Sequence, residues 1–389
     1  MKRISEDFLV VSCDGCNDCY VGTLRGIQQN GSIVVSRGLE TKEIRPAMFI
    51  FHNPRERFLT CPGRNIHSFF QILESIWILG GRGDVKWISK YLKNMEKYSD
   101  GQDQFHAPYG KRMRHVGDGR SFQYDNRGFH DQFEHCYRYL SKDPDTRHAV
   151  MTFWDPVLDF YKVETIDRPC NTTFYFLIRD GKLDLTISNR SNDINLGFFN
   201  ANVVQFSVIL ETMAMLLGVP VGKQIHFINS LHYYTDDPIT EEVLSRNKEE
   251  TEFNMYKYIR PHPFGLKNEA GVDPWYLFNS CFEDFFDDEK AIWEGKLSDN
   301  ILHNDFSFLR DALYVARSFY FYKKKRNYTK AIKDIYEVKA NDIFITCSEF
   351  LARKIDDTNF NLCFRLDERF NSMTYISAFN YILSHRGLV

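Results

Sequence analysis

The residues most capable of chemistry lie between Arg168 and Tyr234. Cys170 stands directly after Pro169 and before Asn171, and a strand-like run follows it. A thiolate is a nucleophile, and cationic or polar neighbours such as Arg168 lower the pKa of a thiol. Most free cysteines are instead small buried residues, so a packing role for Cys170 is the alternative. Its place at a strand end favours the nucleophile, because scaffolds present functional side chains there.

Three arginines occupy loops or strand ends, at Arg37, Arg147 and Arg190. Surface ion pairing is the ordinary role of such residues, but guanidiniums that converge on one pocket suit a phosphate, whose geometry they match. Asn202 carries an amide that donates and accepts together, which suits the edge of a nucleobase. The residues alone thus indicate a thiol-nucleophile enzyme that acts on a phosphorylated, ring-containing substrate.

Glu74 lies in a segment whose apolar residues recur at helical spacing, from about Ile66 to Leu79. A lone glutamate in such a helix usually lies on its solvated face. Its neighbours three and four positions away include Phe70 and Trp77, however. A carboxyl partly embedded among such residues has a raised pKa and holds a proton near neutrality.

Strand and helix patterns along the chain indicate an α/β fold. Two strand-like runs joined by a turn at Asp180–Gly181 place Cys170 before the first run and Arg190 after the second. The expected strands are residues 47–51, 149–154, 172–178 and 183–187, and the expected helices are residues 66–79, 85–98, 128–141, 276–286 and 306–322, with more helices from about 328. We expect an N-terminal segment at 1–35, a catalytic domain at 36–265 and a mostly helical C-terminal extension at 266–389.

The composition is that of a globular protein in a reducing setting. A formal charge of −3, from 49 basic and 52 acidic residues, argues against a general nucleic-acid-binding role. No apolar run reaches the ~18 residues of a membrane span, and the N-terminus lacks the apolar core of a secretory signal. Nine cysteines scattered through 389 residues predict free thiols and a cytoplasmic location.

Cys13, Cys16 and Cys19 are closely spaced in the N-terminal segment. Structural zinc takes four ligands, and no second cysteine pair or cysteine–histidine pair follows nearby. We therefore expect a turn-rich loop with three free thiols. A metal site completed by residues from elsewhere in the chain is the alternative.

The order of these motifs resembles the thymidylate synthase family, which includes the pyrimidine-nucleotide hydroxymethylases. The resemblance runs from about Arg37 to Gly265. Its most specific parts are Arg-Pro-Cys-Asn at 168–171, Asp-Gly-Lys-Leu at 180–183, Asn-Arg-Ser-Asn-Asp-Ile-Asn-Leu-Gly at 189–197, Asn-Ala-Asn at 200–202 and Leu-His-Tyr-Tyr at 231–234. One extra residue lies between Gly197 and the next helix. With that insertion Asn202 takes the place of the family's base-reading asparagine, whereas a later insertion would put Ala201 there.

The resemblance implies a mechanism and a fold. Cys170 attacks C6 of a pyrimidine nucleoside monophosphate, which makes C5 a nucleophile for the one-carbon unit of 5,10-methylenetetrahydrofolate. Glu74 handles protons through water, and Tyr109 lies near C5 in the proton-abstraction network. The implied fold is a large mixed or antiparallel sheet, flanked by helices, that packs against its twin in a homodimer.

The resemblance also implies the binding residues. For the nucleotide these are Arg37 and Arg190 at the phosphate, Arg147 donated there by the second subunit, Asn202 at the base, His232 and Tyr234 at the sugar, and Ser191 and Asn171 in the same pocket. For the folate they are Asp193 and Gly197. The resemblance implies no metal.

Departures from the family pattern separate its branches. The usual double arginine is Arg147–His148 here, Asn171 replaces the histidine that normally follows the nucleophile, and no tryptophan lies in residues 88–108. More than 120 residues follow Pro263, where family members that reduce the intermediate end with a tail that closes the site. A pocket that admits water favours a 5-hydroxymethyl product over a methyl group.

We therefore expect 5-hydroxymethylation, with reductive methylation to thymidylate as the alternative. Hydroxymethylases that act on cytosine commonly have an aspartate at the position of Asn202. An amide pairs more naturally with N3–H and O4 of uracil, so a uridylate is expected, with either ribose or deoxyribose. A catalytically inactive nucleotide-binding relative is the remaining alternative, suggested by His148, Asn171 and the missing tryptophan.

Overall fold

The chain divides into two compact units in the computed structural model, which describes residues 2–4, 8–116, 130–161, 164–247, 254–268, 271–296 and 304–355. Unit 1 comprises Met1–Arg57 and Leu73–Thr240, and unit 2 comprises Phe58–Ile72 and Glu241–Val389. Helices α2 (Ser68–Leu79) and α8 (Pro238–Arg246) each contain a boundary between the units.

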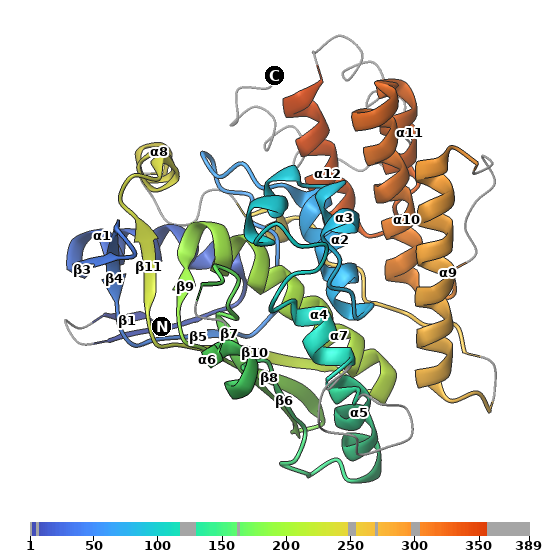
Figure 1. The fold of residues 1–389 in the computed structure, drawn as a ribbon, viewed down its shortest axis with the longest axis horizontal. Helices are drawn as coiled ribbons and strands as arrows, with labels where there is room; N and C mark the ends of the chain where they lie inside the picture. The colour runs from blue at the N-terminus through green and yellow to red at the C-terminus, as the bar shows by residue number, and fades with distance from the viewer. Residues whose placement is uncertain are drawn as a thin grey trace. The chain divides into compact units, whose positions relative to one another are not determined.

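Unit 1 is built on two sheets that mix parallel and antiparallel strands (Figure 1). In the described residues, the larger sheet has seven strands in the order β1–β2–β5–β10–β8–β7–β6, and the smaller has four in the order β3–β4–β11–β9. The strands are β1 Lys2–Ile4, β2 Leu9–Cys13, β3 Ser32–Ser36, β4 Leu39–Ile44, β5 Ala47–Phe51, β6 Val150–Thr152, β7 Asn171–Arg179, β8 Lys182–Asn189, β9 Asn192–Asp193, β10 Val221–Ile228 and β11 Leu231–Tyr234. The predicted α/β fold with a mixed sheet is confirmed.

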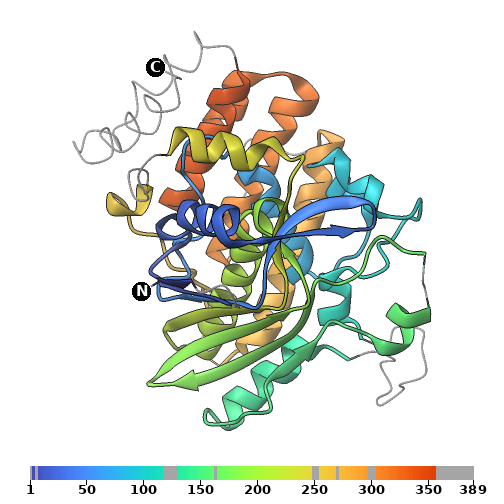
Figure 2. The ribbon, with the colours of Figure 1, turned by 90° about the vertical axis from the view of Figure 1, so that its left-hand side faces the viewer.

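The long helix α7 (Val203–Leu217) packs against strands β8 and β10 of the larger sheet (Figure 1 and Figure 2). Alternate residues of β8 are buried, as a strand with one covered face requires. Phe174 of β7 contacts Phe206 of α7, with ring centroids 4.7 Å apart. Burial of these aromatic side chains is the main favourable term that holds the helix on the sheet.

The remaining helices of unit 1 are short. They are η1 Cys16–Asp18, α1 Tyr20–Asn30, α3 Val85–Ser89, η2 Lys93–Tyr98, α4 Tyr109–Arg114, α5 Gln132–Lys142, α6 Pro156–Tyr161 and η3 Ile194–Asn202. The last is a π-helix that continues into α7, and the N–H of Val203 donates to the carbonyl of Phe198, five residues earlier. A π-helical turn holds more residues than an α-helical turn and is found most often at functional sites.

One prediction about local structure is confirmed and one was wrong. Residues 14–19 form bends and turns around the short 3-10 helix η1, and Cys13, Cys16 and Cys19 are free thiols, as expected. Helix α1, which follows, was not predicted, although Tyr20, Leu24 and Ile27 recur at helical spacing and are buried on it. Residues 85–98 are not one helix: α3 ends at Ser89, the backbone at Leu92 is extended, and the 3-10 helix that follows buries no residue. Residues 128–129 of the helix expected at 128–141 lie outside the described residues, and within the described part α5 begins at Gln132.

The long helix Ile194–Leu217 also corrects the expectation about membrane spans. Among the described residues, this π-helix and α7 together form one helix that is long and apolar enough to span a membrane by length and composition. Most of it is buried inside the structure. It is therefore best understood as the core helix of unit 1.

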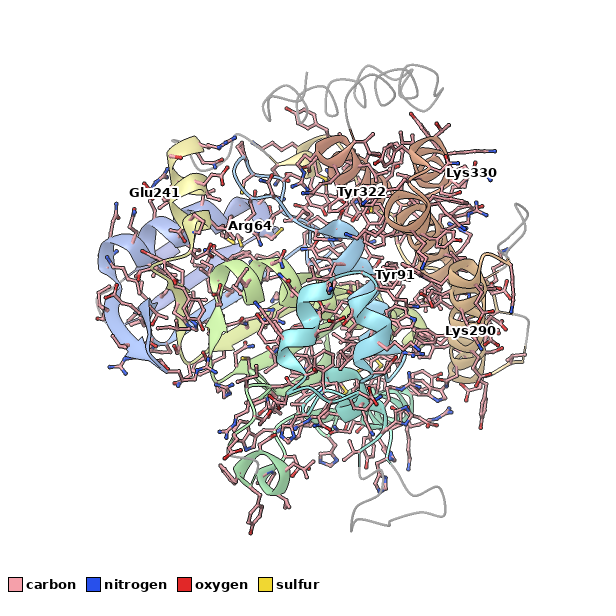
Figure 3. All side chains as sticks on the ribbon, turned by 45° about the horizontal axis from the view of Figure 1, so that its top comes forward. Arg64, Tyr91, Glu241, Lys290, Tyr322 and Lys330 are labelled. Atoms are coloured by element: carbon pink, nitrogen blue, oxygen red, sulfur yellow. The ribbon has the colours of Figure 1, made fainter. Side chains whose placement is uncertain are left out.

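Unit 2 is helical in its described residues. Besides the parts of α2 and α8, its helices are η4 Met255–Lys257, α9 Pro274–Glu294, α10 Ser307–Tyr320, the π-helical η5 Phe321–Lys325, α11 Tyr328–Tyr336 and α12 Asn341–Lys354. The hydroxyl of Ser318 donates to the carbonyl of Ala331 at 2.7 Å and ties α10 to α11. Polar side chains such as Lys290 of α9 and Lys330 of α11 are exposed (Figure 3).

Candidate active site

Cys170 and Arg190 lie next to each other because of the β7–β8 hairpin. Its two turn residues, Asp180 and Gly181, have φ values of 52° and 70°, the left-handed pair that a two-residue hairpin needs. The antiparallel strands then bring the residue before β7 beside the residue after β8, and the N–H of Arg190 donates to the carbonyl of Cys170 at 2.9 Å. Nη2 of Arg190 lies 3.7 Å from the Cys170 sulfur. A bulge near Thr172 adjusts the register at this end of the hairpin.

The Cys170 thiol is mostly protonated at neutral pH. Burial raises its pKa, and the positive charges of Arg190 and Arg37 lower it without cancelling that effect. The expectation of a lowered pKa was therefore wrong, because it took account of charged neighbours in the sequence and not of desolvation. The two arginines whose charges lower the thiol pKa, Arg190 and Arg37, belong to β-hairpins, and neither is the sequence neighbour Arg168.

Tyr109 contacts the backbone at the nucleophile. Its hydroxyl oxygen accepts hydrogen bonds from the N–H groups of Cys170, at 3.1 Å, and Asn171, at 3.2 Å. Burial raises the pKa of Tyr109, with the Cys170 charge acting in the same direction, so the phenol is neutral. The Asn171 side chain forms a further hydrogen bond with the phenol, which acts to lower this pKa.

A buried ion pair holds the segment that carries Tyr109. The guanidinium of Arg112 donates to both carboxyl oxygens of Asp159, at 2.6 and 2.7 Å, and His106 Nε2 lies 3.0 Å from Asp159 Oδ1. Nearby, the N–H of Ala107 donates to Asp167 at 2.8 Å. The sequence patterns did not single out Arg112 or Asp159, since only their contact across separate segments reveals them.

Glu74 is buried on α2, in the part of that helix that belongs to unit 1. Burial raises its pKa to about 8, in the direction predicted from its apolar neighbours, and a hydrogen bond from the Gln205 side chain opposes the shift. Among the described residues, its Oε2 atom has no hydrogen-bond partner. The carboxyl can therefore hold a proton near neutrality and has one oxygen left for a ligand or water.

Asn202 is buried at the end of the π-helix. Its Oδ1 accepts from Asn192 at 2.9 Å and its Nδ2 donates to Gln205 at 3.3 Å. A Cβ atom added at Gly197 would lie 2.4 Å from Asn192 Oδ1, so the glycine makes room for that amide. Neighbouring Ala201 is less buried than Asn202. The extra residue that the resemblance placed between Gly197 and the next helix falls within this π-helix and stays a prediction.

Asn171 pairs with Asn189 across the start of the β7–β8 hairpin. The Asn189 amide donates to the side-chain oxygen of Asn171, and both side chains are buried. Within the described part of the chain, Asn171 Nδ2 and Asn189 Oδ1 have no hydrogen-bond partner. Two unpaired buried polar atoms beside Cys170 suit a polar ligand.

The smaller sheet brings Asp193, His232 and Arg37 into the same unit. His232 of β11 is directly opposite Asp193 of β9, and its ring lies 5.5 Å from that of Tyr234. Burial lowers the pKa of His232, with Arg37 and Arg190 acting in the same direction and Glu43 opposing them. Arg37 stands in the left-handed conformation, with a φ of 52°, at the tip of the β3–β4 hairpin.

Two predicted site residues have a less defined place. Arg147 is exposed in the loop between α5 and β6, and in the described residues no hydrogen bond or ion pair joins it to the other predicted site residues. Ser191 follows Arg190 directly and is partly buried. Neither residue has a contact that identifies a role within one copy of the chain.

The three N-terminal thiols cluster, but no group of three or more metal-binding side chains of suitable geometry occurs in the residues that the structure describes. Cys16 and Cys19 are buried, and the Cys19 side chain is hydrogen-bonded to Cys13. Burial raises the pKa of Cys19, with Cys13 acting in the same direction. The Cys19 thiol is therefore protonated at neutral pH and is a poor nucleophile.

Trp87 qualifies the observation that residues 88–108 contain no tryptophan. It lies one residue before that segment, on α3, and is buried against Tyr91, with ring centroids 5.1 Å apart. The guanidinium of Arg82 and the ammonium of Lys90 lie over its ring. Contacts with Tyr91, Arg82 and Lys90 are those of a packing role.

Known proteins match the part of the chain that carries these residues. Deoxyuridylate hydroxymethyltransferase of Bacillus phage SP01 is 45% identical over 229 residues, which are 58% of this chain and 59% of that protein. The protein of the same name from Pseudomonas phage M6 is 35% identical over 202 residues, 52% of each chain. That from Delftia phage PhiW-14 is 27% identical over 237 residues, 58% of this chain and 62% of that protein. The chain thus spans between about half and three-fifths of the curated relatives it matches.

A further match is to a protein family rather than to a single protein. The sequence profile of the family described as thymidylate synthase matches residues 18–260, which include Glu74, Tyr109, Cys170, Arg190 and Asn202. This match covers more than half of the chain and contains the cysteine, the arginines and the amides in the order that the resemblance implied. The chain belongs to the thymidylate synthase family.

Proposed function

We propose that the protein transfers a one-carbon unit to C5 of deoxyuridine monophosphate and releases the 5-hydroxymethyl nucleotide. The observation that carries the proposal is the placement of Cys170 between Tyr109 and Arg190. The Cys170 N–H donates to the Tyr109 hydroxyl at 3.1 Å, and Nη2 of Arg190 lies 3.7 Å from the Cys170 sulfur. This arrangement occurs in a member of the thymidylate synthase family whose relatives are named deoxyuridylate hydroxymethyltransferase. A nucleophile, a phenol and a guanidinium are the groups that addition to C6 of a nucleotide requires.

Cys170 forms the bond to C6 as its proton leaves the sulfur. Because burial raises the pKa of this thiol, the charges of Arg190 and Arg37 supply the stabilisation that the thiolate needs at the moment of attack. The same two guanidiniums are the proposed phosphate ligands. A substrate phosphate would therefore reduce their effect on the thiol while it places C6 beside the sulfur.

Glu74 and Tyr109 are the proposed proton carriers. Glu74 is protonated near neutrality, with Oε2 available to donate through water to the oxygen at C4 of the base. Tyr109 is held against the nucleophile by the N–H groups of Cys170 and Asn171, which places its hydroxyl in the network proposed to receive the C5 proton. Transfer of the one-carbon unit to C5, with loss of the C5 proton and departure of the folate as tetrahydrofolate, would leave a methylene carbon to which water adds. Cleavage of the C6–S bond would then complete the 5-hydroxymethyl product and restore Cys170.

The co-substrate implied by the family is 5,10-methylenetetrahydrofolate, which supplies the one-carbon unit at the oxidation level of formaldehyde. The residues near Asp193 suit a pterin ring. Oδ1 of Asp193 is fixed by the N–H groups of Asn195 and Leu196, at 2.7 and 2.8 Å, and a carboxylate accepts the N–H groups of a pterin. The half-exposed side chain of Leu196 offers an apolar contact beside it.

Release of tritium from deoxyuridine monophosphate labelled at C5 tests the proposal. Release should depend on methylenetetrahydrofolate and should fall by about three orders of magnitude or more in Cys170→Ser. Calorimetric binding of the nucleotide to that variant shows that its site is intact. No exchange with any uridine or cytidine monophosphate, ribose or deoxyribose, would refute the proposal and leave a nucleotide-binding protein.

Mass spectrometry of the product separates the two family branches. We expect the mass gain of a hydroxymethyl group. The mass gain of a methyl group would instead identify reductive methylation to thymidylate.

We also propose a homodimer that pairs the open face of the larger sheet. Apolar side chains on that face are exposed, with Val150 at 37%, Tyr175 at 40% and Phe227 at 47%, and Val150 is directly opposite Tyr175 in the sheet. Exposed apolar patches of this kind mark protein interfaces. In such a dimer Arg147 would bind the phosphate in the partner's site.

The domain boundaries at 35 and 265, the folate contact of Gly197, the roles of Ser191, His232 and Tyr234 at the nucleotide, and the cytoplasmic location stay predictions. They are consistent with the proposed reaction and are not needed for its test.

A further inference from the structure

Three buried amides and one buried carboxyl form a continuous hydrogen-bonded chain in unit 1. Asn192 Nδ2 donates to Asn202 Oδ1 at 2.9 Å, and Asn202 Nδ2 donates to Gln205 Oε1 at 3.3 Å. The side chain of Gln205 is in turn hydrogen-bonded to Glu74. None of the four residues is more than 9% exposed. The four residues come from β9, the π-helix, α7 and α2, so this series of hydrogen bonds links four elements.

In this series of hydrogen bonds, each amide donates to the next residue in the direction of Glu74. The side-chain oxygen of Gln205 is used to accept from Asn202, so its NH₂ group is what donates to the Glu74 carboxyl. Rotating the Asn202 amide by half a turn would set its NH₂ against the NH₂ of Asn192 and its oxygen against the oxygen of Gln205. In a buried site, two lost hydrogen bonds and two unpaired polar groups make that rotation costly.

The orientation of the Asn202 amide decides which base it can read. Its oxygen keeps one lone pair and its nitrogen keeps one hydrogen beyond the bonds described, so it offers one acceptor and one donor to a ligand. Uracil presents N3–H and O4, a donor and an acceptor. Cytosine presents N3 and the 4-amino group in the reverse order, and a rotated amide would suit it instead.

We propose that Asn192 and Gln205 are positioning residues that determine base selection, by holding the Asn202 amide in the orientation that accepts uracil. This inference rests on the proposed function, since it takes Asn202 as the residue that reads the base. It goes beyond that function because neither Asn192 nor Gln205 is among the residues that the family resemblance assigned.

The local structure supports a fixed chain. Gln205 follows Asn202 by three residues, the spacing that puts two side chains on one face of a helix. On the other side, the absence of a side chain at Gly197 leaves the space that the Asn192 amide fills. Both neighbours of Asn202 are therefore held by the backbone that surrounds them.

Two substitutions at Gln205 give opposite expectations for positioning and for simple packing. Gln205→Met keeps the length of the side chain but removes the acceptor, so Asn202 is released. Gln205→Glu keeps an acceptor for Asn202 while it places a second carboxyl beside Glu74. If Gln205 only fills space, the apolar methionine is the milder change, because a buried carboxyl pair is strongly unfavourable.

The measurement is the ratio of kcat/KM for deoxyuridine and deoxycytidine monophosphates, from tritium release at C5. We expect Gln205→Met to lower the preference for uracil by about tenfold or more, and Gln205→Glu to keep it within about threefold of the unmodified protein. Gln224→Met is the matched control, because Gln224 is a fully buried amide on β10 that bonds to His226, and its preference should not change.

The outcomes separate this inference from the proposed function. An unchanged preference in Gln205→Met, or an equal loss in Gln224→Met, would overturn the inference and leave the reaction in place. If the unmodified protein shows no exchange, the reaction is refuted, and calorimetric affinities of the same variants for the two nucleotides still test base selection. Asn192→Ala removes the other hydrogen bond that holds the Asn202 amide, and it replaces Gln205→Met if thermal melting shows that Gln205→Met does not fold.

Discussion

The sulfur of Cys170 and Nη2 of Arg190 lie 3.7 Å apart, although 20 residues separate them in the sequence. The β7–β8 hairpin produces this proximity, since its two-residue turn fixes which residues are opposite each other along the two strands. The charge on Arg190 is the largest influence that lowers the pKa of the buried thiol. The hairpin therefore supplies both the nucleophile and the group that stabilises its ionised form.

Arg190→Met should raise the pKa of the Cys170 thiol further. Loss of a nearby positive charge destabilises the thiolate, so alkylation of Cys170 by iodoacetamide should be slower at pH 8, and its pH dependence should move to higher pH. Peptide mass spectrometry follows Cys170 separately from the other thiols. Arg179→Met, at the opposite end of the same hairpin, is the control and should leave the rate unchanged; an equal effect of both would contradict the assignment.

Glu74 should make the folded protein less stable as the pH rises. Its pKa is raised from 4.5 to about 8, so between these values the folded state binds a proton that the unfolded state has lost. Its contribution to stability is complete below pH 4.5 and falls as the pH increases to about 8. Glu74→Gln should remove that part of the pH dependence of the melting temperature. Parallel curves for the two proteins across this range would argue against a protonated Glu74.

Mixing two inactive variants tests whether Arg147 acts across a dimer. Arg147→Ala keeps Cys170, and Cys170→Ser keeps Arg147, so a mixed dimer contains one site with both groups if the arginine comes from the partner. Statistical mixing should then restore up to about a quarter of the activity, because half of the dimers hold one complete site of two. Light scattering confirms the dimer, and Phe227→Asp should weaken it. No recovery from a proven mixed dimer would place Arg147 in its own subunit's site.

Asp159→Asn should destabilise unit 1 and displace Tyr109. The substitution removes a buried charge that accepts two hydrogen bonds from Arg112, and leaving a buried guanidinium without its partner costs about 3 kcal/mol. Urea unfolding measures the loss, and tritium release below the unfolding transition measures the effect on Tyr109. Asp145→Asn, at an exposed aspartate of the same unit, is the control. Equal stabilities of the two variants would show that the ion pair does not hold this segment.

Gly197→Ala should weaken base selection although none of the three amide residues is substituted. The new Cβ atom would lie 2.4 Å from Asn192 Oδ1, so that side chain must move and give up its hydrogen bond to Asn202. The preference for deoxyuridine over deoxycytidine monophosphate should fall in the same direction as in Gln205→Met. Gly265→Ala is the control, because its Cβ atom would make an ordinary contact of 3.9 Å with Ser307. A normal preference in Gly197→Ala would mean that Asn192 is not needed to hold the amide.

Local patterns predicted the parts of the site that one hairpin organises. The turn at Asp180–Gly181 and the two flanking strands were enough to place Cys170 beside Arg190. The apolar neighbours of Glu74 were enough to give the direction of its pKa shift. In both cases the relevant partners lie within a few turns or along one strand pair, which is the range over which periodicity carries information.

The rest of the site depends on contacts between distant segments. Asp159 meets Arg112 across 47 residues, and Glu74 meets Gln205 from a separate helix, so no spacing rule relates them. The raised pKa of Cys170 arises from burial by the whole unit, which neighbours in the sequence do not report. The extended backbone at Leu92 interrupts the helix expected at 85–98, and no proline or glycine in that segment predicts the interruption.

The π-helix before α7 bears on how such a site changes during evolution. Because α7 is fixed by the aromatic core, a residue gained or lost upstream is absorbed by the wider turn and not by a shift of the core helix. If Asn202 reads the base as proposed, loss of one codon between Gly197 and Asn202 would tighten that turn and bring a different side chain to its position. Length variation at this point can thus alter which substrate a descendant accepts, in a single genetic event that spares the scaffold.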